Sequence, residues 1–124
     1  MVTTEVAQLS KECNAWRETL RSYRDEFGQL KNRLQVLAGR QTHRDVLLEI
    51  EHLDNQFHIQ LINIHDLKKA IKNHQHRIDK EMAQGHLSEE AAADHENLYD
   101  DYSRLDHTLQ TIKQEFAEFS NHLR

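Results

Sequence analysis

The chain of 124 residues contains no proline, only three glycines and one cysteine. Proline and glycine are the residues that most often interrupt helices, so their scarcity favours long helical segments. The lone cysteine, Cys13, has no partner for a disulfide within the chain, which agrees with a reducing compartment. Hydrophobic residues make up 37%, a low share for a compact globule, and predict an elongated protein with little deep interior.

Long apolar runs are also missing. No stretch approaches the roughly 20 apolar residues needed to cross a bilayer, and the first residues lack the basic and apolar blocks of a signal peptide. We therefore expect a cytoplasmic protein that does not associate with membranes.

Two glycines divide the chain into three periodic segments. Gly39 and Gly85 each follow such a segment, and glycine just past a helix is the favoured left-handed cap. Thr42 and Ser88 are then placed to cap the next helix with a side-chain oxygen. This arrangement predicts helices over about residues 3–38, 43–84 and 89–123.

Apolar residues recur at alternating three- and four-residue steps in the first and third segments, which is typical of a coiled-coil seam. Helices with one narrow apolar stripe are not stable alone, and short turns force sequential helices to run antiparallel. The sequence therefore predicts an all-α, single-domain protein over residues 1–124, an elongated antiparallel three-helix coiled coil. The two seams consist of Val6, Leu9, Cys13, Trp16, Leu20, Tyr23, Phe27, Leu30, Leu34 and Leu37, and of Ala91, His95, Leu98, Tyr102, Leu105, Leu109, Ile112, Phe116, Phe119 and Leu123.

The second segment has a wider apolar face than the other two. Its main seam runs from Val46 to Ile78, and Leu48, Ile59 and Ile62 form a second stripe. This stripe has two interpretations. Long side chains of the other helices would cover it, or it binds a second subunit or another protein.

Charge is unevenly distributed between the second and third segments. The second ends in a basic block, and the third begins with an acidic one. In an antiparallel bundle these blocks lie side by side, so we expect them to neutralise each other. With a net charge of −5, this argues against nucleic-acid binding. The basic block is Lys68, Lys69, Lys72, Arg77 and Lys80; the acidic block is Glu89, Glu90, Asp94, Glu96, Asp100, Asp101 and Asp106.

The chain is rich in histidine, with ten in total, but no two are three or four residues apart, as two ligands on one helix turn would be. His95 nevertheless occupies a seam position, His74 lies near the matching seam of the second segment, and Cys13 is close to the same layer. Two interpretations remain open: a polar layer that fixes the helix register, or a site for zinc or another soft metal.

Catalysis requires a concave pocket, and seams filled with large side chains leave no room for one, so we expect no enzyme activity and no cofactor. Trp16 and Tyr102 fall on facing seams and predict an aromatic core layer. The leading hypothesis is a binding or scaffolding protein that acts through protein–protein contacts, including self-association, at Leu48, Ile59 and Ile62. The alternative is a metal-binding or metal-sensing bundle that uses Cys13, His74 and His95. Partner identity and pH-dependent association stay open.

Overall fold

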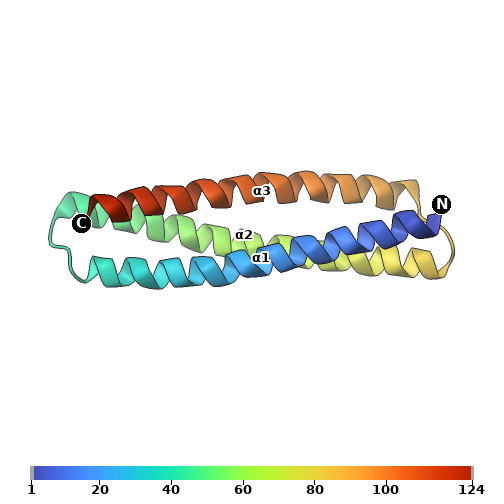
Figure 1. The fold of residues 1–124 in the computed structure, drawn as a ribbon, viewed down its shortest axis with the longest axis horizontal. Helices are drawn as coiled ribbons and strands as arrows, with labels where there is room; N and C mark the ends of the chain where they lie inside the picture. The colour runs from blue at the N-terminus through green and yellow to red at the C-terminus, as the bar shows by residue number, and fades with distance from the viewer. Residues whose placement is uncertain (1, 124) are drawn as a thin grey trace.

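The computed structural model describes the backbone of residues 2–123 and the side chains of residues 7–123. It contains three helices, α1 (Val2–Ala38), α2 (Arg44–Ala83) and α3 (Glu89–His122). Sequential helices run antiparallel along a long narrow bundle, with the chain reversing at each end (Figure 1). The predicted fold is confirmed, and the predicted helix bounds agree to within about one residue at each end.

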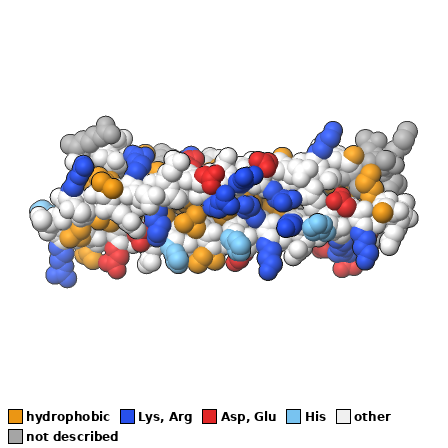
Figure 2. All heavy atoms as spheres, turned by 90° about the horizontal axis from the view of Figure 1, so that it is seen from below, with side chains coloured by type: hydrophobic (Ala, Val, Ile, Leu, Met, Phe, Trp, Pro, Cys, Tyr) orange, Lys and Arg blue, Asp and Glu red, His pale blue; other side chains and the backbone are white. Residues whose placement is uncertain are grey.

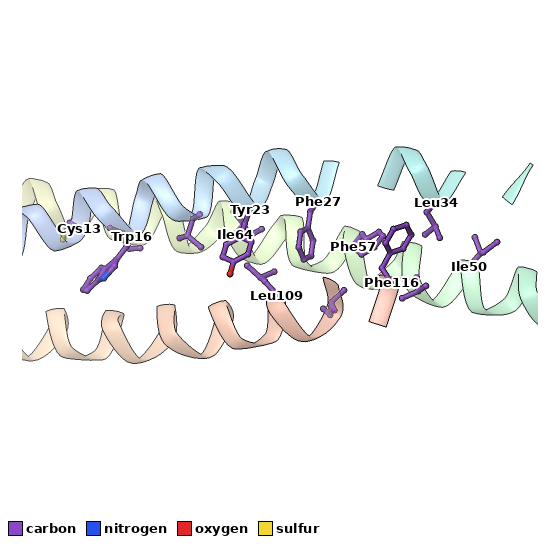
Figure 3. Close-up of a cluster of buried hydrophobic side chains, with 14 of the residues drawn as sticks. Cys13, Trp16, Tyr23, Phe27, Leu34, Ile50, Phe57, Ile64, Leu109 and Phe116 are labelled. Carbon is purple, nitrogen blue, oxygen red and sulfur yellow. The ribbon is translucent and has the colours of Figure 1, made fainter. Parts of the chain in front are cut away.

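The core is a single line of buried side chains along the bundle axis, to which every helix contributes (Figure 3). Near its middle, one phenylalanine from each helix meets the others edge to face: Phe27 and Phe57 have ring centroids 5.5 Å apart, and Phe57 and Phe116 5.7 Å. Trp16 stacks on Tyr102 at 5.7 Å, as the facing seams predict. The predicted seam residue Val6 lies outside the described side chains.

The turn between α2 and α3 is built as predicted. Gly85 takes a positive φ of 77°, the left-handed conformation that glycine adopts without strain. Ser88 Oγ accepts a hydrogen bond from the backbone N–H of Ala91 at 3.1 Å. The Glu81 carboxylate accepts from the backbone N–H of Ser88 at 2.6 Å and from Arg77, and these bonds lower the pKa of Glu81. The turn therefore satisfies the backbone groups that a helix start leaves open.

The turn between α1 and α2 differs from the prediction at both of its caps. Within the described chain, Gly39 is not left-handed, and α2 has His43 at its N-cap, with no side-chain bond, in place of Thr42. Instead, the N–H of Arg40 donates to the carbonyl of Leu37 at 3.1 Å, which tightens the end of α1 into a narrower turn. Gln41 N–H donates in the same way to the carbonyl of Ala38. These hydrogen bonds to the carbonyl three residues earlier satisfy the last carbonyls of α1, so a left-handed cap is not needed there.

Truncating one buried isoleucine tests the core. Ile64 is fully buried, whereas Ile62 on the same helix is 48% exposed. We expect Ile64→Ala to lower the free energy of unfolding by roughly 2–5 kcal/mol, because it leaves a cavity that the neighbouring helices cannot fill. Ile62→Ala, the matched control, should cost less than about 1 kcal/mol. Urea denaturation measures both, and equal losses would contradict the helix orientation described above.

The cap of α3 is tested by Ser88→Ala, which removes the oxygen that accepts from Ala91. We expect a loss of about 1 kcal/mol in the free energy of unfolding, the usual value for an N-cap. The control is Ser103→Ala in the exposed middle of α3, where alanine has the better helix propensity and should cost nothing. A thermal melt of each variant shows the difference, and identical midpoints would contradict this role of Ser88.

Candidate metal centre

Three potential metal ligands converge near one end of the bundle, one from each helix. They are Cys13 on α1, His74 on α2 and His95 on α3, and their ligand atoms all lie within 4.8 Å of one another. Nδ1 of His95 is 3.0 Å from Nε2 of His74 and 3.9 Å from Sγ of Cys13. All three residues are buried, with exposed fractions of 0%, 6% and 5%. The structure thus brings together the three metal-ligand candidates named from the sequence.

Glu12 orients the imidazole of His95 from the opposite side. Its Oε2 lies 2.9 Å from Nε2 of His95. An ionised carboxylate only accepts hydrogen bonds, so Nε2 carries the proton and Nδ1 keeps its lone pair pointed at the cluster. A carboxylate behind a ligating histidine is the usual arrangement in metal sites, where it fixes the tautomer. The sequence pattern did not predict the role of Glu12, whose only signal was its position next to Cys13.

The ionisation states of the cluster follow from its burial. Burial, and then the repulsion that would arise if His74 and His95 were both protonated, lower the pKa of His74, so its imidazole is neutral at neutral pH. Burial raises the pKa of the Cys13 thiol to about 11, with the Glu12 and Asp79 carboxylates adding to the effect. Cys13 is therefore a protonated thiol in this environment and a poor nucleophile. A bound cation would reverse that balance, because it stabilises the thiolate directly.

The donor geometry fits a tetrahedral ion. With Zn–S near 2.3 Å and Zn–N near 2.0–2.1 Å, adjacent ligand atoms are roughly 3.3–3.7 Å apart. The separations from Nδ1 of His95 to Nε2 of His74, 3.0 Å, and to Sγ of Cys13, 3.9 Å, lie on either side of that range. Small side-chain rotations would therefore place all three donors around one ion. Thiolate and imidazole are the ligands preferred by zinc and similar metals, not by magnesium or calcium.

A cleft of about 870 Å³ lies between α1 and α3 beside this cluster. Glu12 and His95 line it, which gives the cluster a path to solvent. The expectation that the seams leave no hollow is wrong here, where the wall of the cleft on α3 includes the short side chain of Ala92. The remaining lining residues are Gln8, Leu9, Trp16, Leu87, Glu96 and Tyr99.

The apolar stripe predicted on α2 lies on a different part of the molecule. Leu48, Ile59 and Ile62 are 53%, 44% and 48% exposed, and the core residues of α2 point the opposite way. The interpretation that other helices cover this stripe is therefore wrong.

Most histidines are also at the surface. Eight of the ten are exposed: His43, His52, His58, His65, His76, His86, His107 and His122.

The expected neutralisation of the basic end of α2 by the acidic start of α3 is only partly right. Arg77 does bridge to α3, with ion pairs to Asp94 at 2.8 Å and Glu90 at 3.5 Å. Among the described residues, Arg77 makes all the ion pairs between these two blocks, and Lys68 instead lies beside the arginines of α1. The antiparallel register was predicted correctly, but helix rotation directs most of the lysines elsewhere.

Comparison of the chain with protein families, curated proteins and solved structures finds no match. None of the helices over residues 2–123 combines the length and apolar character needed to cross a membrane.

Proposed function

We propose that this bundle binds a zinc-class metal ion through Cys13 Sγ, His74 Nε2 and His95 Nδ1. The observation that carries the proposal is the convergence of three buried donors from three helices within 4.8 Å. The Glu12 carboxylate behind His95 supports it, because it presets the tautomer that a metal requires.

Binding changes the protons of the cluster in a defined way. With the lone pair of His95 Nδ1 directed at the cluster, Nε2–H of His74 donates to it. To offer Nε2 as a ligand, His74 must therefore carry its proton on its own Nδ1 instead. Cys13 releases its proton on ligation. The ion then links α1, α2 and α3 at one end of the bundle, so metal occupancy stabilises the folded chain, by about 2.7 kcal/mol at a hundredfold excess over Kd.

Cobalt titration of the reduced protein tests this proposal. We expect one Co²⁺ per chain, with a near-ultraviolet thiolate-to-cobalt absorption band that zinc abolishes by displacement, and a higher melting temperature with zinc. Cys13→Ala should remove the band and His74→Ala should weaken binding at least about tenfold. His76→Ala, an exposed histidine on the same helix, should change nothing. Metal binding that is equal in all three variants, or absent from the unmodified protein, would contradict the proposal.

Glu12→Gln provides a second test that leaves every ligand in place. The amide holds His95 less firmly, so affinity should fall about 10- to 100-fold while the absorption band persists. An unchanged affinity would show that Glu12 does not orient the site.

The exposed stripe on α2 favours a second function, self-association of the bundle. We infer that two copies pair through α2 in antiparallel fashion, centred on Ile59 and Ile62. Glu51 lies about two turns before Ile59 and Lys69 about two turns after Ile62, and both are exposed. About five whole turns separate Glu51 from Lys69, so they share one flank of α2. If the two-fold axis of the dimer passes midway between Ile59 and Ile62, Glu51 of one copy lies beside Lys69 of the other copy.

Light scattering on a sizing column tests self-association over a range of concentrations. We expect a mass above that of the 14.7 kDa monomer, and monomer only after the double change Ile59→Gln and Ile62→Gln. Val36→Gln, at an exposed position on α1, is the control. Glu51→Lys should weaken the dimer and addition of Lys69→Glu should restore it, because the ion pair is then reversed. A monomer at every concentration would contradict this function.

A further inference from the structure

A second cleft, of about 390 Å³, lies between α1 and α2, and its walls are mainly cationic. Lys and Arg side chains gather near the middle of the face seen in Figure 2. Neither the apolar seams nor the charge blocks of the sequence predicted this cluster, because its members come from two helices. The cleft is lined by Asn14, Arg17, Glu18, Arg21, Arg24 and Lys68.

Acidic side chains neutralise this cluster only in part. Arg24 pairs with Asp25 at 3.1 Å, and Arg21 meets Glu18 only at 4.0 Å, with both side chains largely exposed. Arg17 donates to the neutral amide oxygen of Gln75 at 3.1 Å. Within residues 7–123, no carboxylate forms an ion pair with Arg17 or with Lys68. The cleft therefore keeps an excess of positive charge.

Lys68 is the member of the cluster that α2 contributes. It is half-buried between the helices, and its pKa is lowered by burial and then by the charges of Arg24, Arg21 and Arg17. Like charges that face one another across a hollow repel, and an anion placed between them removes that repulsion. Guanidinium groups add direction, because their forked N–H groups match the oxygens of phosphate.

The spacing of the cations indicates the size of the anion. Arg17, Arg21 and Arg24 follow one another by four and three residues along one flank of α1, a span of about 10 Å. One phosphate group would reach only part of that row, whereas a chain of two or three phosphoryl groups would follow it. We propose that this cleft binds a small polyphosphate anion, either free or as the phosphate chain of a nucleotide.

Calorimetric titration with sodium tripolyphosphate, diphosphate and orthophosphate, in buffer without metal ions, tests this inference. We expect saturable binding of one tripolyphosphate per chain, weaker binding of the shorter anions, and a loss of affinity with added salt. Lys68→Gln and Arg21→Gln should each weaken binding about tenfold. Lys80→Gln, the same charge change on an exposed part of α2 well away from the cleft, should weaken it less than about twofold. Circular dichroism confirms that each variant is folded.

Three results would overturn the inference. One is the absence of saturable binding, and another is equal loss from Lys68→Gln and Lys80→Gln, which would mean a general charge effect. The third is tighter binding of a DNA duplex than of tripolyphosphate, which would assign the face to nucleic acid. A nucleoside triphosphate distinguishes a free polyphosphate from a nucleotide as the ligand. If it binds with the same affinity as tripolyphosphate, the phosphate chain alone is recognised; if it binds more tightly, the base or sugar also contacts the protein. Because the cleft and the metal cluster have no residue in common, failure here leaves the proposed metal site untouched.

Discussion

The whole structure depends on one constraint: each helix has a single apolar stripe, so none of the three is stable unless the other two cover it. The core line of Leu, Ile and Phe side chains satisfies that requirement along most of the bundle. Burial of apolar side chains does not by itself determine the register of the helices along the bundle axis. Specific polar contacts do, and the ion pair from Arg77 to Asp94 and the hydrogen bond from His95 to Glu12 are two of them.

The cluster of Cys13, His74 and His95 combines such a register contact with a chemically competent site. In the described residues every buried polar side-chain atom has a hydrogen-bond partner, so the cluster is stable as a neutral network. The contacts that align the three helices are also the contacts that hold three donor atoms together. Preorganisation for an ion thus follows from a feature that the fold needs in any case.

Sequence periodicity predicted the helices, their direction and the burial of most seam residues, because each depends on spacing along one chain. It also placed His74 and His95 in one layer with Cys13 close to it, since helix length and turn position determine which layers meet. It missed Glu12 and the cluster around Lys68, and it misjudged the neutralisation of the lysines. These depend on the rotation of each helix about its own axis, and a rotation of a few tens of degrees decides which partner a long polar side chain meets. Gln60 is a similar case. The seam pattern places its apolar neighbour Leu61 in the core, but Gln60 is the more buried of the two, with 7% of its surface exposed, and its side-chain oxygen accepts a hydrogen bond from Asn63.

The same geometry separates the surfaces of the bundle. The metal cluster opens toward the cleft between α1 and α3, the cationic cleft lies between α1 and α2, and the stripe of Ile59 and Ile62 faces away from both partner helices. A three-helix rod has one groove for each helix pair and one outer face for each helix, so these surfaces do not compete for the same residues. Binding at one of these surfaces would therefore affect binding at another only through the packing of the helices. The cluster of Cys13, His74 and His95 is where such coupling would be strongest, because an ion bound there would restrain all three helices at once.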